Sequence, residues 1–361
     1  MDFPPVSVVM SVYNGQTFLA EAMESILGQT YRDFEFVIID DGSIDSTPDI
    51  LAKYAAMDRR IRVHRHANKG RALSLNVGIN LARGKYIARM DADDIALPER
   101  LGQQKGFMDS HPEVGLLGGA VELVSANGRT LRTIRFPTSD SAIRSVMFAY
   151  NPFCHPSVVM AKEVVLASGG YRKALLDADD YDLWLRVSER TQVANLEKCV
   201  LRYRIHAGQV SIQNMRHQKM SVLVADAAAL KRRNGGRDPL SGVEEITPEL
   251  LSALGVTSAQ IQEAVLGGYN YWMDVLGQTD PEVELKVIEG FLAIGESQGV
   301  TRSAVANAWL RTAGIHFRQG RLARALVATG RAIQTRPIVA GRPAKRALMR
   351  LAAAFRATQK S

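Results

Sequence analysis

Aspartates occur in three short clusters within the first 182 residues, at residues 40–45, 91–94 and 177–182. Carboxylate side chains accept hydrogen bonds from N–H groups, bind hard cations such as Mg²⁺, and take up protons. Each cluster therefore has the residue type needed for ligand binding, metal binding or acid–base catalysis. Which of these a cluster performs depends on the secondary structure that holds it.

The first cluster begins at the end of a predicted strand. Residues 34–40 form a mostly apolar run that ends on Asp40, and Asp41 follows directly. Ligands of open α/β sheets bind beside the carboxyl ends of parallel strands. A carboxylate there can accept a hydrogen bond from the imide N–H of uracil or thymine. The alternative is a purely structural Asp-Gly turn, with one of residues 45–47 capping the next helix.

The second cluster, Asp91, Asp93 and Asp94, follows another predicted strand at residues 85–90. Three carboxylates within four residues repel one another and are unfavourable without a cation. They suit Mg²⁺ or Mn²⁺, which bind through one or two carboxylates plus substrate phosphates and neutralise a diphosphate leaving group. An Asp-x-Asp sequence is common by chance, but its place after a strand, like that of Asp40, strengthens the metal-binding interpretation.

The third cluster opens a helix predicted at residues 180–190. Leu183, Trp184 and Val187 lie three, four and seven residues after Asp180, which is the spacing of one buried helical face. Asp180 then lies in the first turn, where backbone N–H groups stabilise a carboxylate. Two interpretations remain open: a capping residue, or a general base that deprotonates an acceptor hydroxyl.

Alternating strands and helices are expected to position these clusters. Strands separated by helices of about 10–13 residues are typical of βαβ units and predict an α/β domain with a mostly parallel sheet. The predicted strands are residues 6–12, 34–40, 61–65 and 85–90, with helices at 16–27, 47–57 and 71–81. A mixed second half is predicted to complete the same domain, with strands at 115–124, 131–136 and 197–204, and a strand or strand–helix junction at 157–166.

The rest of the chain is predicted to be helical. One helix is expected at 216–233, a polar linker with glycines follows at 234–244, and helical patterns continue from about residue 246. We therefore expect an α/β domain at 1–214, a helix and linker at 215–244, and an all-α region at 245–361. Residues 304–337 have the spacing of one tetratricopeptide repeat, with an ordinary helical hairpin as the alternative.

Charge is unevenly distributed along the 361 residues. The net charge is +8, but no acidic residue follows Glu296 whereas thirteen Lys and Arg do, so the remainder is net negative. Such a basic segment indicates an anionic partner. Leu348, Leu351, Ala352 and Phe355 lie at helical spacing among arginines, which favours a helix on an anionic membrane surface. A solvated basic face, or pairing with the acidic remainder, is the alternative. Nucleic acid is disfavoured because the α/β domain offers no base-reading module.

The sequence also bears on the cellular compartment. No apolar run approaches the ~20 residues of a membrane helix, and the first residues have neither the basic region nor the cleavage site of a signal peptide. Cys154 and Cys199 make no disulfide framework, which favours a reduced protein. We therefore predict a cytoplasmic protein, peripheral on the inner face of the cell membrane if the basic segment binds lipid.

Taken together, the motifs resemble those of the family 2 glycosyltransferases, which have the GT-A fold. The resemblance spans about residues 5–212 and is specific because many motifs recur in the same order. The segments that carry it are VSVVMSVYN (6–14), SILGQTY (25–31), IDDGS (39–43), NKG (68–70), Asn76, ARGKYIARMDADD (82–94), HPSV (155–158), the segment around Asp180, and YRIH (203–206) before Ser211.

The resemblance implies how the donor nucleotide is held. Ser11, Tyr13 and Asp41 would line the nucleoside pocket, and Asp40 would support it. Asp91 would reach the ribose or the metal. These residues would make a nucleotide-diphosphate sugar the donor, with UDP- or dTDP-type donors favoured.

The resemblance also implies a metal site of Asp93 and Asp91, occupied by Mn²⁺ or Mg²⁺. His206 would lie near the metal and the diphosphate, and its alternative is a loop histidine bonded to the backbone. His155 would be structural or would face the acceptor.

Asp180 would be the catalytic base in the same resemblance. Relatives commonly carry Glu where this chain has Asp179, and the shorter side chain leaves the division of labour between Asp179 and Asp180 open. A single displacement assisted by this base would invert the anomeric configuration, as the family does.

The expected activity is therefore sugar transfer to an acceptor hydroxyl, on a glycan or a lipid-linked acceptor of cell-surface polysaccharide synthesis. One alternative is a catalytically silent nucleotide-sugar-binding scaffold that acts through its helical tail. Another is a sugar-1-phosphate nucleotidyltransferase, which is disfavoured because the loop at residues 13–16 has a single glycine. A dinucleotide dehydrogenase is disfavoured because no G-x-G-x-x-G motif is present.

Overall fold

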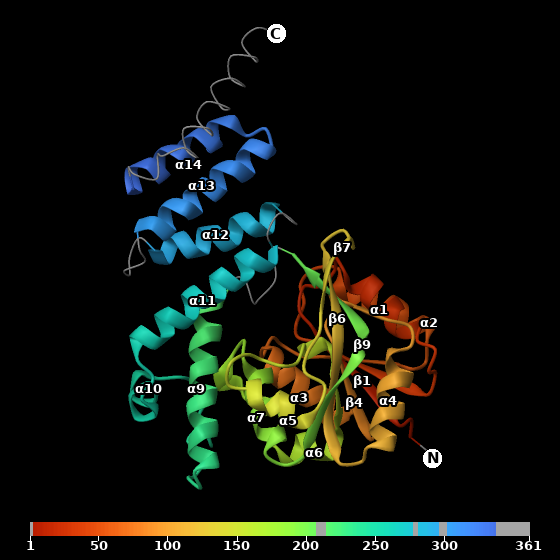
Figure 1. The fold of residues 1–361 in the computed structure, drawn as a ribbon. Helices are drawn as coiled ribbons and strands as arrows, with labels where there is room; N and C mark the ends of the chain where they lie inside the picture. The colour runs from red at the N-terminus through yellow and green to blue at the C-terminus, as the bar shows by residue number, and fades with distance from the viewer. Residues whose placement is uncertain (1–2, 207–213, 277–280, 296–301, 337–361) are drawn as a thin grey trace. The chain divides into compact units, whose positions relative to one another are not determined.

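The computed structural model describes residues 3–206, 214–276, 281–295 and 302–336. Contacts within these residues divide the chain into two compact units. The first comprises the described residues up to 205 together with 216–261, and the second comprises the described residues of 206–215 and those after 261. Figure 1 shows that the first unit is built around a sheet and that the second is helical.

The first unit follows the predicted alternation of strands and helices as far as β4. Its elements are β1 (Val6–Val12), α1 (Leu19–Leu27), β2 (Phe34–Asp40), α2 (Thr47–Met57), β3 (Ile61–Arg65), α3 (Arg71–Leu81), β4 (Tyr86–Met90), β5 (Ile95–Ala96), α4 (Arg100–Ser110), β6 (Val114–Ser125), β7 (Thr130–Ile134), α5 (Asp140–Val146), η1 (His155–Ser157), β8 (Val159–Ala161), α6 (Lys162–Ala167), η2 (Lys173–Leu175), α7 (Asp179–Ser188), β9 (Gln192–Ile205), α9 (Met215–Arg233) and α10 (Pro248–Leu254). The helices α4 and α5 were not predicted, and β9 begins earlier than expected.

Within the described residues, nine strands form one mixed sheet in the order β3-β2-β1-β4-β8-β6-β9-β5, with β7 paired to β6. β1 runs parallel to β2 on one side and to β4 on the other. In this register Val12 lies beside Asp40, and Met10 lies beside Met90. β8 is antiparallel to both β4 and β6. The carboxyl ends of β1, β2 and β4 therefore meet at one edge of the sheet.

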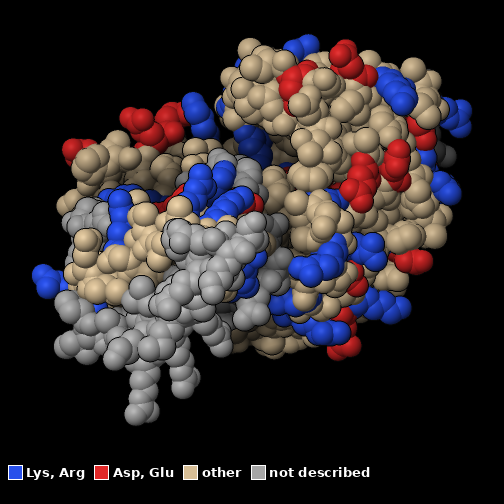
Figure 2. Space-filling model, turned by 90° about the horizontal axis from the view of Figure 1, so that it is seen from above, with Lys and Arg blue, Asp and Glu red and all other residues tan. Residues whose placement is uncertain are grey.

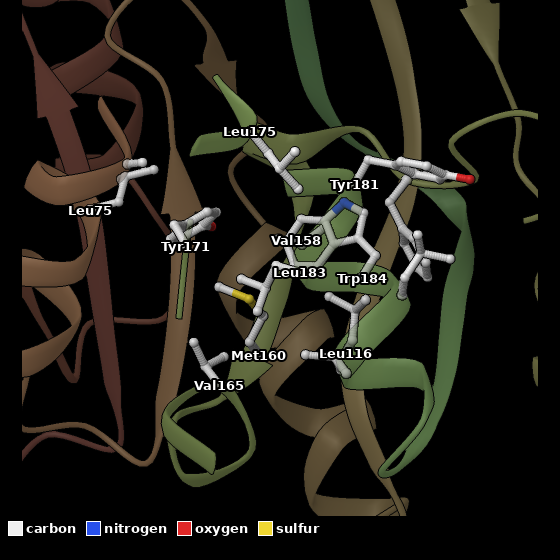
Figure 3. Close-up of a cluster of buried hydrophobic side chains, with 14 of the residues drawn as sticks. Leu75, Leu116, Val158, Met160, Val165, Tyr171, Leu175, Tyr181, Leu183 and Trp184 are labelled. Carbon is white, nitrogen blue, oxygen red and sulfur yellow. The ribbon is translucent and has the colours of Figure 1, made fainter. Parts of the chain in front are cut away.

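The central strands are apolar on both faces, which is why they form the middle of the sheet. Every residue of β2 is buried, and every residue of β1 except Ser11. Strands covered on both faces need such continuous apolar runs rather than an alternating pattern. Residues of α3 and α7 join β1 and β2 in one buried cluster, and Figure 3 shows Trp184 of α7 among the apolar side chains of this cluster.

The burial of Trp184 makes a stability prediction possible. Its ring is fully buried and lies 5.9 Å from the His155 ring and 6.1 Å from the Phe153 ring, between centroids. We expect Trp184→Ala to lower the free energy of unfolding by about 3–5 kcal/mol, because apolar burial is lost and a cavity remains. Urea denaturation followed by circular dichroism measures this change. Leu166→Ala is the control, since Leu166 is 46% exposed, and equal effects of the two substitutions would contradict the prediction.

The C-terminal region is helical, as predicted. Its helices are α11 (Ser258–Leu276), α12 (Pro281–Gly295), α13 (Arg302–Arg318) and α14 (Leu322–Thr335). α13 and α14 lie side by side and are joined through Gly320, whose φ of +71° favours glycine. The Arg331 guanidinium lies 4.8 Å from the centroid of the Trp309 ring. Residues 304–336 of the repeat-like span thus form a helical hairpin, and its assignment as a tetratricopeptide repeat stays a prediction.

Part of the C-terminal positive charge is paired within this unit. Arg311 forms an ion pair with Glu284, and Arg321 lies 2.9 Å from Glu282. Both glutamates belong to α12, so these arginines find acidic partners in space that they lack nearby in sequence. Figure 2 shows Lys and Arg side chains interspersed with Asp and Glu on the face in view. The amphipathic segment predicted at 348–355 lies outside the described residues.

Two further features concern the helices and the cysteines. None of the helices in the described ranges is long and apolar enough to cross a membrane. Cys154 and Cys199 are both free thiols rather than a disulfide.

Candidate active site

The acidic clusters lie on the loops that follow the central strands. Asp40 is the last residue of β2, Asp91 is the first residue after β4, and Tyr13 is the first residue after β1. Because these three strands are adjacent and parallel, the loops after them come together in the crevice where α/β sheets bind ligands. Ser11 is partly exposed near the end of β1, and Tyr13 is 50% exposed.

Asp40 stabilises the turn that follows β2. Its Oδ1 atom accepts a hydrogen bond from the backbone N–H of Ser43 at 2.9 Å, and its Oδ2 atom lies 3.2 Å from Arg65 Nε. Gly42 in this turn has φ of +80°, and a Cβ atom there would lie 2.7 Å from the backbone nitrogen of Asn68. Both conditions require glycine. Asp40 is buried and therefore supports the loop from beneath.

Asp41 ties the same loop to the start of α3. Its Oδ1 and Oδ2 atoms accept hydrogen bonds from the backbone N–H groups of Lys69 and Gly70, at 2.8 and 3.0 Å. His66 Nδ1 lies 3.4 Å from Oδ1. These contacts hold the carboxylate in one orientation. A carboxylate oxygen has two lone pairs, so each oxygen can still accept a hydrogen bond from a ligand.

The carboxylates of Asp91, Asp93 and Asp94 form a compact group, with one oxygen of each residue within 4.8 Å of the others. Asp94 is buried; its Oδ1 atom accepts the backbone N–H of Arg204 at 2.8 Å. Its Oδ2 atom has no hydrogen-bond partner among the described residues. Burial raises the pKa of Asp94 well above its ordinary value, and the charges of Asp93 and Asp91 add to this rise. A cation would relieve this repulsion.

A buried chain of polar side chains supports the Asp91 carboxylate of this acidic group. Asp91 Oδ1 pairs with Arg89 Nη2 at 2.5 Å, and Arg89 Nε donates to His155 Nε2 at 3.2 Å. The Tyr171 hydroxyl lies 2.8 Å from the same histidine nitrogen. Burial lowers the pKa of His155 well below its ordinary value, and the charges of Arg89 and Arg71 lower it further. His155 is therefore a neutral core residue in this structure.

The first two residues of α7 have different surroundings. Asp179 is only 1% exposed and forms an ion pair with Arg71, the first residue of α3. Asp180 is partly exposed, and its Oδ2 atom accepts a hydrogen bond from Asn151 Nδ2 at 3.2 Å. Burial and the Asp179 carboxylate raise the pKa of Asp180 to about 6, although Arg71 opposes the rise. A carboxyl group with a pKa near neutrality suits general acid–base chemistry.

Three neighbours of the site were not assigned a role from the sequence. Arg71 directly follows the NKG motif, so its position beside the motif was a usable signal. Asp94 was counted as acidic but not assigned as a metal ligand. Asn151 lies in an irregular loop, where nothing in the sequence distinguishes it. His206 directly follows the last residue of β9, and residues 207–213 after it lie outside the described part of the chain.

Comparisons with known proteins identify the class of this enzyme. A family model described as glycosyl transferase family 2 matches residues 7–167. An uncharacterized glycosyltransferase of Methanocaldococcus jannaschii is 36% identical over 61% of this chain and 77% of its own. The O-antigen biosynthesis glycosyltransferase WbnJ of Escherichia coli is 32% identical over 56% and 80%, and the amylovoran biosynthesis glycosyltransferase AmsE of Erwinia amylovora is 35% identical over 57% and 78%.

These matches, together with the acidic edge of the sheet, define the protein as a glycosyltransferase. More particularly, the chain belongs to the family 2 glycosyltransferases. The family prediction from the sequence motifs is thus confirmed. This assignment favours an enzyme over a scaffold, and glycosyl transfer over nucleotidyl transfer.

A solved structure extends the comparison to the fold. S. aureus TarS 1–349 in complex with UDP-GlcNAc aligns over 91% of this chain and 88% of that one, with a TM-score of 0.52 and 16% identity. At this identity the likeness concerns the fold alone. The predicted fold, a GT-A α/β domain followed by a helical region, is confirmed.

Proposed function

We propose that this glycosyltransferase is inverting and metal-dependent, and that it transfers a sugar from a nucleotide-diphosphate donor to an acceptor hydroxyl. The observation that carries the proposal is that the site contains two separate sets of carboxylates. Asp91, Asp93 and Asp94 form a compact acidic group, whereas Asp180 is a separate carboxylate with its own hydrogen-bond partner. Burial lowers the pKa of Arg71, but the charges of Asp179, Asp180 and Asp91 outweigh this effect and raise it. That both sets of carboxylates act on this guanidinium supports a single site.

The acidic group has the chemistry of a site for Mn²⁺ or Mg²⁺. Asp93 and Asp91 would hold the ion. The buried Asp94 Oδ2 atom without a partner and the mutual repulsion of the carboxylates support this fit. When bound, the ion would supply positive charge to the diphosphate of the donor.

Asp180 would act as the general base. Its carboxylate accepts the proton of the acceptor hydroxyl as the hydroxyl oxygen bonds to the anomeric carbon. The bond between that carbon and the diphosphate oxygen breaks on the opposite face, and its electron pair leaves with the diphosphate. One displacement of this kind inverts the anomeric configuration. The hydrogen bond from Asn151 would orient the carboxylate for this step.

Asp41 is proposed to select the base of the donor. We expect uridine and thymidine diphosphates with Mn²⁺ to raise the melting temperature more than guanosine or adenosine diphosphate, because a bound ligand stabilises the folded state. Asp41→Asn should weaken UDP binding about 10–100-fold, since a hydrogen bond to a charged group is worth about 1.5–3 kcal/mol. Thermal shift and calorimetric titration measure these effects. Asp49→Asn, an exposed change on α2, is the control, and equal stabilisation by all four nucleotides would contradict the assignment.

The acceptor is proposed to be a glycan or a lipid-linked intermediate at the inner membrane surface. The part of the basic segment after residue 340 would bring the enzyme to that surface. Each Lys or Arg near an anionic surface contributes about 1 kcal/mol, so the full chain should co-sediment with anionic but not neutral liposomes at low salt. A chain ending at residue 340 should lose most of this binding. Equal binding of both chains, or none at low salt, would contradict the membrane proposal and leave the glycosyltransferase assignment intact.

A further inference from the structure

The ion pair between Arg71 and Asp179 joins two elements that are far apart in the sequence. Arg71 begins α3, Asp179 begins α7, and the Asp179 side chain is buried beneath the site. Asp179 Oδ1 accepts the bond from Arg71 Nη2. Asp179 Oδ2 and Arg71 Nε have no hydrogen-bond partner among the described residues. Asp179 therefore depends on Arg71, because a buried charge without its partner is strongly unfavourable, whereas the Arg71 side chain is 31% exposed.

The turn before α7 is also held by hydrogen bonds from α9. Asp177, just before α7, has φ of +66°, which is uncommon for a residue with a side chain. Its backbone oxygen accepts a hydrogen bond from Gln218 Nε2 at 3.1 Å. The Leu176 oxygen accepts one from Ser221 Oγ at 3.1 Å. α9 thus fixes the entry to α7, and Arg71 fixes its first turn.

Among the described residues, Asp179 on the same helix and Arg71 on α3 are the charged groups with the largest effects on the pKa of Asp180. The charge of Asp180 also acts on Cys154 and Tyr171, but burial raises the pKa of both, so they are neutral near pH 6. Asn151 is uncharged. Burial makes the largest contribution to the raised pKa of Asp180, and the balance between one negative and one positive neighbour adjusts it further.

We infer that Arg71 and Asp179 are a positioning pair: they fix the first turn of α7 and keep the charge around Asp180 in balance, and Asp179 takes no proton from the acceptor. The inference rests on the proposed function of Asp180 as the base. It assigns different roles to two adjacent aspartates, which the sequence alone does not distinguish. The buried Asp179 is a structural anion with a fixed partner, whereas the partly exposed Asp180 can reach a substrate.

The pH dependence of kcat at saturating substrates tests the inference. In the wild type, kcat is expected to fall as the pH drops through about 6, and this fall is the acid limb of the profile. Asp179→Asn removes a negative neighbour and leaves Arg71 unopposed, so the limb should move down by about one pH unit. The double variant Arg71→Met/Asp179→Asn removes both charges, so neither remains without its partner. The pH of the acid limb should then return toward the wild-type value. Arg71→Lys keeps the charge and should leave the limb in place with a lower kcat.

Asp180→Asn in the same series separates this inference from the proposed function. If Asp180→Asn keeps its activity, the base assignment fails and the inference falls with it. If Asp180→Asn is inactive but the limb stays in place in Asp179→Asn, the proposed function stands and the inference alone is wrong. If the pair has a purely structural role, its variants should lower kcat without moving the acid limb. If Asp179→Asn lowers kcat more than Asp180→Asn does, Asp179 is the base. Either result overturns the inference.

Discussion

Asp180→Asn is expected to lower kcat by about 10²–10⁴-fold, the usual contribution of a general base. Asparagine has nearly the same shape but cannot take up the proton of the acceptor hydroxyl. Asp180 has no predicted role in holding the nucleotide, so donor affinity should change little. The measurement is steady-state kinetics with a titration of the donor nucleotide, which separates loss of chemistry from loss of binding.

The pH profile gives this prediction a second readout. The carboxylate is the active form of a base, and the pKa of Asp180 is raised to about 6. Wild-type kcat should therefore fall as the pH drops below about 6 and reach a plateau above it. This limb should vanish in Asp180→Asn. Asp49→Asn, the same chemical change at an exposed position, should retain both the rate and the limb; full activity of Asp180→Asn would exclude it as the base.

Asp93→Ala is expected to abolish metal-dependent donor binding. A metal ion contributes several kcal/mol to stabilising charge on the leaving group, so activity should fall by about 10³-fold. The fold should persist because Asp93 is partly exposed. Its backbone oxygen, which accepts a hydrogen bond from Arg204 Nε at 2.8 Å, is also unchanged by the substitution. Calorimetric titration of UDP with and without Mn²⁺, beside a thermal melt, measures both effects.

The neighbouring Asp94 provides the contrast for this experiment. Asp94 accepts the backbone N–H of Arg204 in β9 and is buried, so Asp94→Ala should lower the melting temperature as well as activity. Asp93→Ala should change activity alone. Wild-type turnover by Asp93→Ala, or by the wild type in excess chelator, would be incompatible with a metal site at this position.

The order of strands and helices up to residue 90 was determined by the sequence itself. Residues 6–12, 34–40 and 61–65 were predicted with the bounds that the structure has. β1 and β2 are covered on both faces, so they appear as mostly apolar runs bounded by polar turns. The edge strand β3 is only partly buried and is recognised instead by its alternation of apolar and polar residues. The acidic clusters could be placed at strand ends for the same reason. The family followed from motifs because each occupies a loop of fixed geometry after such a strand.

Only the tertiary structure revealed α4, because half of its buried face is polar: Arg100 and Gln104 are buried beside Leu101 and Met108. Arg100 Nη2 donates to the Arg89 carbonyl oxygen at 2.7 Å, and Gln104 Nε2 donates to the Ser157 carbonyl oxygen at 2.8 Å. Hydrophobic periodicity detects helices that bury apolar side chains, and it misses one whose inner face is satisfied by hydrogen bonds from distant strands. The partners that make Arg100 burial favourable come from segments unrelated to it in sequence.

The same reason explains which parts of the site only the tertiary structure decided. The sequence determined that residues 179 and 180 are both aspartates at the start of a helix, and adjacency gave no ground for separating them. The difference arises because Arg71 reaches Asp179 from α3 whereas Asn151 reaches Asp180 from a loop. His155, structural or acceptor-facing by sequence, lies in the core because Arg89 and Tyr171 enclose it. Residue types and their order are local properties, but burial and charge pairing depend on what the fold brings alongside.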